Sequence, residues 1–134
     1  MGTCRIGRGC RVDVGENARL SIGSDSFIND HCKVVAQHNI EIGRGCAIGW
    51  GCEIVDDNFH DIWFEEERLP RHGKIIIGDK VWLGSNVTVL RGSKVSDGSV
   101  VASGAIVTRV FDEPNCLIAG VPAKVIKRNI RWKV

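Results

Sequence analysis

The chain has 134 residues, of which 43% are hydrophobic and 25% are charged, and its formal net charge is +2. This composition indicates a single folded domain over residues 1–134 and excludes a largely disordered chain. The small charge gives no indication of a nucleic-acid partner, and no apolar run approaches the roughly 20 residues of a membrane span. Because residues 1–20 also lack the unbroken apolar stretch of a secretory signal, we expect a cytoplasmic protein.

Aliphatic residues recur every six positions along most of the chain. Short registers with this spacing begin at Ile6, Ile22 and Ile42, and they are separated by slips. An unbroken register then runs through Ile77, Leu83, Val89, Val95, Val101 and Val107. A period of six fits neither an amphipathic helix nor the alternation of a half-buried strand. It predicts an all-β fold, a parallel β-helix whose three short sides make a coil of roughly 18 residues.

Small or β-branched residues fill the second inward position of each repeat, four residues after the aliphatic one. In the long register these are Val81, Val87, Ser93, Ser99 and Ala105. The cysteines stand at the same position, two residues before an aliphatic residue, and they are Cys4, Cys10, Cys32, Cys46, Cys52 and Cys116. We expect buried, reduced thiols that fill the core, because their spacing matches neither a disulfide framework nor a zinc site.

The repeat is interrupted between Ile54 and Ile75, and we place an inserted loop at about 55–76. This loop contains three aromatic residues, two histidines and a run of three glutamates. Connections longer than about 12 to 15 residues without secondary structure are usually functional, so we expect the loop to carry a site. The alternative is a packing flap whose aromatic side chains cover a neighbouring coil or subunit.

A second interruption follows Val107, where turns that contain proline and then a basic tail replace the repeats. We expect residues from about 112 to 134 to cap the stack, because an uncovered last coil would expose strand edges and an apolar end. An anionic small ligand is a sufficient functional explanation for the basic tail, and a solvated surface is the alternative.

Four stretches of the sequence stand out beside the repeats. They are DNFH at 57–60, IIIGDKVWLGSNVTVLRG at 75–92, SDGSVVASGAIVT at 96–108 and IAGVPAKVIKRNIRW at 118–132. These stretches resemble the left-handed β-helix (hexapeptide-repeat) acyltransferases, and most closely the O-acetyltransferases that modify sugars and surface polysaccharides. The resemblance implies a left-handed triangular prism, homotrimers with active sites between subunits, acetyl-CoA as co-substrate and no metal.

Acetyl transfer to a hydroxyl needs a base that accepts the hydroxyl proton. His60 stands six residues after Ile54, where the next inward residue would fall, and the resemblance implies that it is the general base. His72 in the same loop is the alternative base. The other two histidines, His31 and His38, lie in regular coils and are expected to be structural.

A carboxylate near the base would orient its ring, and Asp56, Asp57 and Asp61 are the candidates. We choose Asp57, although the sequence does not decide among the three. The alcohol attacks the thioester directly in this scheme, so no nucleophilic serine is required. A covalent acyl-enzyme through a cysteine is disfavoured by the inward placement of all six thiols.

Residues 18 apart lie above one another in a three-sided coil, so Ser85 and Ser103 form one column and Arg91 and Arg109 form another. The resemblance implies a coenzyme A site made by Ser85, Ser103, Thr108, Arg109 and Lys124. The first three would line the pantetheine arm, and the last two would lie near the phosphates. The alternative for each is an ordinary turn or surface residue.

Trp82 directly precedes Leu83 of the long register, so its indole faces outward. The resemblance implies that Trp82 lines the substrate cleft, and packing against another subunit is the alternative. Asn58 and Trp63 in the inserted loop are further substrate-binding candidates. An indole at position 63 would stack on a sugar ring or anchor the loop.

We therefore expect an acetyl-CoA-dependent O-acetyltransferase that acts on a hydroxyl of a saccharide or cell-surface polysaccharide. There are three alternative functions: an N-acetyltransferase on an amino-sugar nucleotide, a zinc-dependent hydratase on the same prism, and a catalytically silent β-helix binding module. The four histidines show no spacing that would bring three of them to one zinc ion, which disfavours the hydratase.

Overall fold

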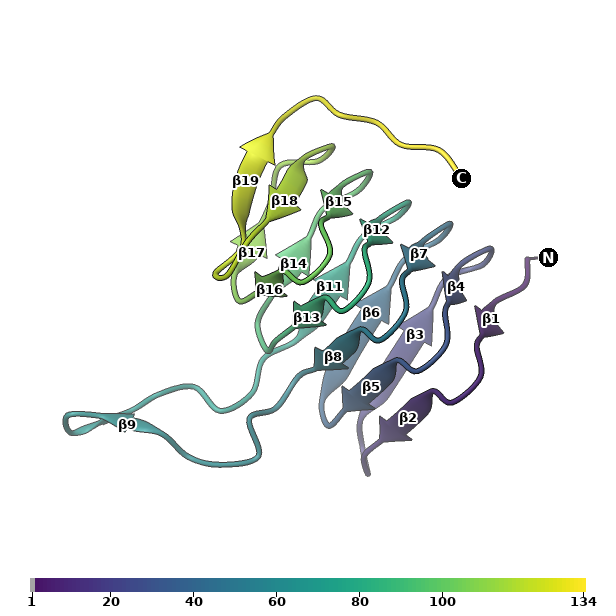
Figure 1. The fold of residues 1–134 in the computed structure, drawn as a ribbon. Coiled ribbons are helices and arrows are strands. Elements are labelled where there is room, and N and C mark those ends of the chain that lie inside the picture. The colour runs from purple at the N-terminus through teal and green to yellow at the C-terminus, as the bar shows by residue number, and fades with distance from the viewer. Residues whose placement is uncertain (1) are drawn as a thin grey trace.

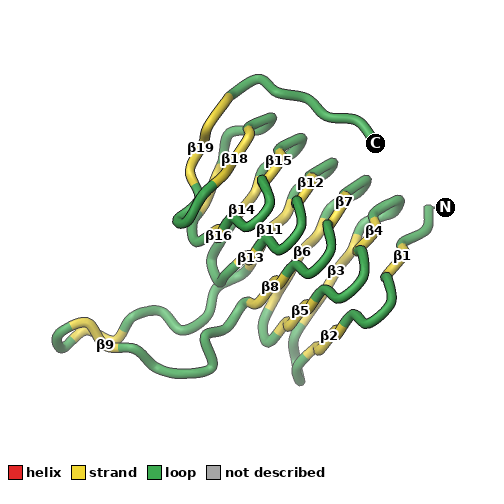
Figure 2. Tube along the Cα trace, viewed as in Figure 1, coloured by secondary structure: helices red, strands yellow, loops and turns green. Residues whose placement is uncertain are grey.

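The structure is a computed structural model that describes residues 2–134. These residues form short strands that are stacked into a three-sided column, and an arm projects from its side (Figure 1). No helix occurs in this part of the chain, and hence no helical segment that would be long and apolar enough to cross a bilayer (Figure 2). The predicted all-β parallel β-helix is therefore confirmed.

Three parallel sheets form the sides of the column. The first sheet contains β1 (Arg5–Ile6), β4 (Phe27–Ile28), β7 (Ala47–Ile48), β12 (Trp82–Leu83), β15 (Val100–Val101) and β18 (Leu117–Ala119), with β19 (Lys124–Lys127) added antiparallel at its end. The second contains β2 (Arg11–Val14), β5 (Lys33–Ala36), β8 (Glu53–Val55), β13 (Thr88–Val89) and β16 (Ile106–Val107). The third contains β3 (Arg19–Ile22), β6 (Asn39–Ile42), β11 (Ile75–Ile77), β14 (Lys94–Val95) and β17 (Val110–Phe111).

The interior is lined by the residues of the six-residue pattern. All six members of the long register are at most 1% exposed, and so are the five small residues at the second position. The hydroxyls among them are satisfied: Ser93 Oγ donates to the Val107 carbonyl (3.0 Å), and Ser99 Oγ accepts from the Cys116 N–H (3.1 Å). The two serine hydroxyls of the pattern are therefore paired inside the core, whereas the buried Oδ1 of Asn39, at the start of β6, has no hydrogen-bond partner among the described residues.

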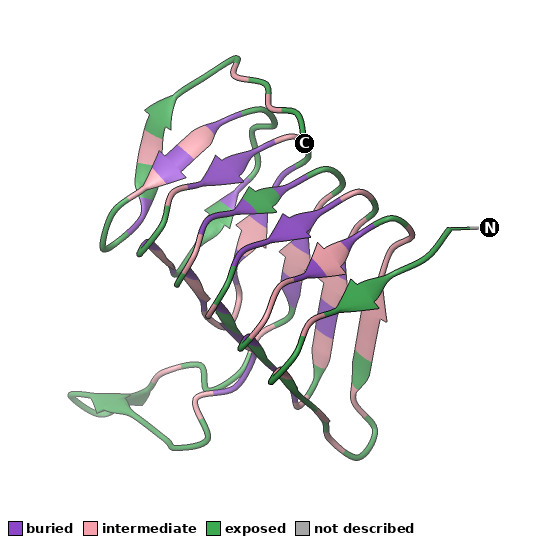
Figure 3. Ribbon diagram, turned by 45° about the vertical axis from the view of Figure 1, so that its right-hand side comes forward, coloured by how far each residue is buried: buried purple, intermediate pink, exposed green. Residues whose placement is uncertain are grey.

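Only some of the cysteines lie in this core. Cys32, Cys46, Cys52 and Cys116 are buried as predicted, and all six thiols are free. Burial raises the pKa of the Cys46 thiol above its usual value, so the thiol stays protonated and unreactive. The prediction is wrong for Cys4, which is exposed, because no described coil covers the outer side of the first coil (Figure 3).

The arm comprises residues 56–74 and leaves the column between β8 and β11, within the predicted loop. It emerges at the corner between the second and third sheets (Figure 1). Its outer part is a small antiparallel hairpin of β9 (Trp63–Phe64) and β10 (Glu67–Arg68). The column closes across the interruption, because β8 pairs with β13 and β6 pairs with β11 as if the arm were absent.

Parallel stacking continues past residue 112, where we placed the start of the cap, as far as β18. The chain then turns back in β19, and the tail after it returns along the first sheet (Figure 1). Trp132 in this tail donates from Nε1 to the Lys80 carbonyl (2.9 Å), and its ring centroid lies 5.9 Å from that of Trp82. The tail therefore covers part of the outward face of the first sheet.

Replacing Leu83 by Ala should lower the free energy of unfolding by about 2–5 kcal/mol, because it removes a fully buried side chain from a packed interior. Val110 offers a matched control, because it is a strand residue that is 48% exposed on the outer face, and Val110→Ala should cost less than about 1 kcal/mol. Urea unfolding measures both changes. Equal losses in the two variants would contradict the inward assignment.

Candidate active site

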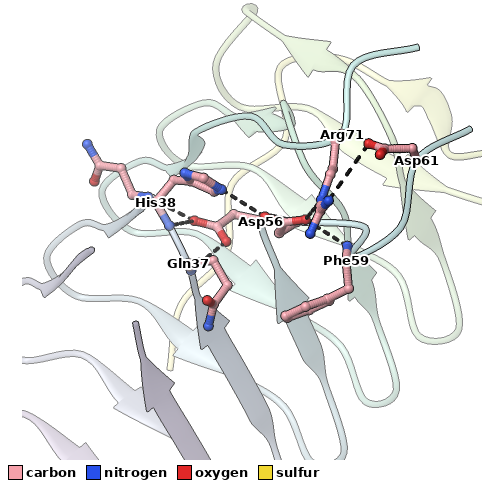
Figure 4. Close-up of polar contacts among 8 residues, drawn as sticks. Gln37, His38, Asp56, Phe59, Asp61 and Arg71 are labelled. Carbon is pink, nitrogen blue, oxygen red and sulfur yellow. Dashed lines mark hydrogen bonds and ion pairs between the residues drawn. The ribbon is translucent and has the colours of Figure 1, made fainter. Parts of the chain in front are cut away.

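The base of the arm is fixed to the preceding coil by the carboxylate of Asp56. This side chain is fully buried. Its oxygens accept hydrogen bonds from three consecutive main-chain N–H groups, those of Gln37 (2.8 Å), His38 (2.9 Å) and Asn39 (2.8 Å) (Figure 4). Because those residues form the corner between β5 and β6, Asp56 fixes the position of the His38 side chain beneath the arm.

The neighbouring carboxylate, Asp57, joins the coil to both ends of the arm. Its Oδ2 lies 2.8 Å from His38 Nε2, and its Oδ1 accepts from the Phe59 N–H (2.7 Å) and from Arg71 Nε (3.2 Å) (Figure 4). Burial alone would raise the pKa of Asp57, but the hydrogen bonds from Phe59, His38 and Arg71 together lower it below its usual value. Asp57 is therefore a carboxylate at neutral pH.

The two ends of the arm lie side by side and form a neck. Asp57 and His72 form an antiparallel bridge, and the His72 ring stacks on the His38 ring with centroids 3.9 Å apart. The Gly73 N–H donates to the Asp56 carbonyl (3.1 Å). A Cβ at position 73 would lie 2.9 Å from the Gly92 nitrogen, so the chain rejoins the column where only glycine fits without a shift.

A pocket of about 600 Å³ opens at the base of the arm. Its polar lining consists of His38, Asp57, Asp61, Arg68, Arg71 and His72. This volume is within the range of small-molecule sites, and the polar groups come from one coil and both ends of the arm. Residues 2–134 contain no group of three or more His, Cys, Asp or Glu side chains arranged to hold a metal ion.

The predicted catalytic residues lie in different surroundings. His60 is exposed on the arm and has no hydrogen bond with any of the described residues. Asp57, which we expected to orient His60, contacts His38 instead. His72, the alternative base, lies in the same pocket as His38. The 18-residue spacing did not locate the contact between Asp57 and His38, because paired residues of β5 and β8 are 20 positions apart, as Lys33 and Glu53 are.

The residues predicted to bind coenzyme A lie at two corners of the column. Ser85 and Ser103 lie at the corner between the first and second sheets, where Ser103 Oγ accepts from the Ser85 N–H (3.1 Å), so they form the predicted column. Lys124 pairs with Ala119, one coil beyond Ser103. Thr108 and Arg109 are exposed between β16 and β17, at the corner from which the arm emerges.

The substrate-binding candidates are also separated. Trp82 is 43% exposed on the first sheet, where it packs against Trp132 of the tail, a contact that neither of our alternatives included. Trp63 is 58% exposed in the hairpin of the arm. Asn58 lies in the neck, where its N–H donates to the Arg71 carbonyl (2.9 Å). One chain therefore does not bring the three residues together.

Replacing Asp57 by Asn should lower the free energy of unfolding at neutral pH by about 1–3 kcal/mol, because three donors lose a charged acceptor. The pKa of Asp57 is lower in the folded state than in the unfolded state, so its contribution is present above the unfolded value and is lost as the pH falls through the folded value. The difference from wild type in urea unfolding should persist down to about pH 5 and shrink below about pH 4. A difference that does not change with pH would contradict this assignment.

No protein-family model matches the chain, but individual proteins do. An uncharacterized 24.8 kDa protein in the cps region of Klebsiella pneumoniae is 39% identical, over 98% of this chain and 59% of that protein. The polysialic acid O-acetyltransferase of Neisseria meningitidis is 38% identical, over 96% of this chain and 58% of that protein. The chain thus spans somewhat less than two thirds of the length of these two relatives.

Solved structures give the same result. The crystal structure of a polysialic-acid-specific acetyltransferase matches with a TM-score of 0.78 and 32% identity, over 98% of this chain and 70% of that one. A hexapeptide-repeat acetyltransferase from Vibrio cholerae, complexed with acetyl-CoA, matches with a TM-score of 0.76 and 25% identity, over 92% of this chain and 70% of that one. The chain therefore belongs to the hexapeptide-repeat acetyltransferase family.

Proposed function

We propose that the protein is an acetyl-CoA-dependent O-acetyltransferase whose acceptor is a saccharide or polysaccharide hydroxyl. The observation that carries this proposal is the histidine-bearing arm, which interrupts a regular β-helix directly before the coil that contains Trp82 and Ser85. Family membership supports acetyl transfer, and the solved relative with acetyl-CoA supports the donor. The Neisseria relative, named for polysialic acid, supports a saccharide acceptor.

In this proposal His60 takes the proton from the hydroxyl of the acceptor saccharide. The neutral imidazole removes the proton as the hydroxyl oxygen attacks the thioester carbonyl. The carbon–sulfur bond then breaks, and the imidazolium returns the proton to the departing sulfur, so that the thiol of coenzyme A is released and the base is regenerated. Asp57 acts as a positioning residue, because it receives the Phe59 N–H directly before His60 and ties the neck to the coil through His38. Its carboxylate therefore determines where the base stands without contacting the base itself.

Acetyl-CoA fits the exposed groups at the two corners. The Ser85 and Ser103 column offers hydroxyl and main-chain groups for the pantetheine arm, and Thr108 offers a hydroxyl at the other corner. Arg109 and Lys124 are exposed cations without a carboxylate partner among the described residues. The phosphates of coenzyme A would be their anionic partners. When bound, the thioester supplies the acetyl group. No metal is needed for this chemistry.

The separation of these residues favours an active site between subunits. Ser85 and Ser103 lie at one corner, whereas the arm with His60 leaves from another and points away from its own column (Figure 1). A second copy would bring its own serine column to the arm, and a closed ring of copies would complete every site. We infer a homotrimer, in agreement with the family resemblance.

Replacing His60 by Ala should lower kcat by roughly 10²- to 10⁴-fold, since the general base is lost, and should leave the acetyl-CoA KM nearly unchanged. His31→Asn is a matched control, because His31 is an exposed coil histidine with a φ of 63°, which Asn tolerates. Acetyl-CoA turnover against a panel of sugars measures both. Undiminished transfer in the His60 variant would exclude it as the base, and a comparable loss in His38→Ala would transfer that role to His38.

Replacing Arg109 and Lys124 together by Ala should raise the acetyl-CoA KM by about 100-fold and lower kcat less, because two charge-assisted contacts to phosphate are lost. The increase in KM relative to wild type should depend on ionic strength. Arg44→Ala is the control, because this exposed arginine lies at the corner between the third and first sheets. If KM stays at the wild-type value, neither cation belongs to the cofactor site.

A further inference from the structure

Polar side chains in most of the column serve the stack itself. Asp79 accepts from the Arg44 N–H (2.9 Å), and Asp97 in turn accepts from the Asp79 N–H (2.7 Å). Ser26 donates from Oγ to the Gly43 carbonyl (2.7 Å). These groups join one coil to the next.

The pocket at the base of the arm is different, because its groups retain free hydrogen-bonding capacity. The Arg68 guanidinium has no hydrogen bond or ion pair with the described residues, and the Asp61 carboxylate lies 3.8 Å from Arg71 Nη1, beyond hydrogen-bond distance. His38 uses only one of its ring nitrogens, and His72 contributes a stacked ring with no hydrogen bond from its side chain. Spare donors and acceptors therefore converge on one cavity.

The charge balance of the pocket indicates the kind of ligand. Two guanidinium groups, Arg68 and Arg71, face two carboxylates, Asp57 and Asp61, so the lining is electrically balanced when the imidazoles are neutral. Such a lining does not favour a strongly anionic ligand or an apolar one. It suits a neutral ring with several hydroxyls, since each hydroxyl both donates and accepts. A volume of about 600 Å³ accommodates a ligand of sugar size.

The hairpin adds an apolar surface beside this pocket. Arg68 and Trp63 are direct cross-strand partners in β9 and β10, so their side chains lie on the same face of the hairpin. The Trp63 indole is 58% exposed, which leaves its ring available as a platform. A sugar ring has an apolar face as well as its hydroxyls, and this combination of indole, guanidinium and carboxylate matches both.

We propose that this pocket is an acceptor subsite in which Asp61 and Arg68 bind ring hydroxyls of the saccharide. The proposal rests on the function proposed above and places the acceptor on the arm itself. The neck that forms the pocket carries Asp57, three residues before His60, so the base and the bound sugar belong to one structural unit. Asp61 and Arg68 then set the affinity for the acceptor and take no part in proton transfer.

The test compares Asp61→Asn and Arg68→Gln with wild type in steady-state kinetics, using methyl glycosides as acceptors. Each substitution should raise the acceptor KM by about tenfold, the effect of one lost charge-assisted contact. The acetyl-CoA KM and the slow hydrolysis of acetyl-CoA without acceptor should not change. Glu67→Gln is the matched control, because Glu67 precedes Arg68 in β10 and its side chain points to the opposite face.

Direct binding of the same methyl glycosides, observed by saturation-transfer NMR without acetyl-CoA, separates this proposal from the function. Saturation transfer in wild type and Glu67→Gln that is lost in Asp61→Asn and Arg68→Gln supports the pocket, even if no acetyl transfer is found. An unchanged acceptor KM in both variants of an active enzyme would overturn the pocket and leave the function intact. A wild-type protein that binds none of the glycosides would also overturn it.

Discussion

The whole structure depends on the burial of side chains six residues apart in one shared interior. The strands are only two to four residues long, so no side of the column is stable alone and each coil depends on its neighbours. Ile54 and Ile75 are both fully buried at the points where the arm departs and returns. The stack is therefore continuous across the interruption, and the arm is free to carry chemistry without weakening the core.

The two aspartates at the neck connect this stable column to the site. Asp56 uses three main-chain donors of the previous coil, so it belongs to the stack, whereas Asp57 reaches from the same strand end to both ends of the arm. A substitution at Asp57 consequently disturbs the arm more than it disturbs the column. The same regular stacking also separates the corners, so the serine column and the arm of one chain remain on different edges.

The repeat predicted the inward residues, the place of the arm and the stacking of Ser85 on Ser103, because all three follow from a fixed period. It did not predict the pairing of Asp57 with His38, because a slip of register around His38 obscures which residues share a corner. The contact between Trp132 and Trp82 could not be predicted from the repeat either, because the path of the tail is set by packing and the tail has no repeating pattern. Cys4 was misassigned because the pattern assumes that a coil lies on either side.

The most direct test of the account is a mixing experiment between two inactive variants, His60→Ala and Ser103→Trp, each damaged at a different corner. If every active site takes His60 from one copy and the serine column from another, random mixing of equal amounts should restore about a quarter of the wild-type activity. The double variant, mixed with itself, serves as the blank. Recovery near that quarter is the predicted result, and a mixture as inactive as the blank would contradict the separation of the two corners.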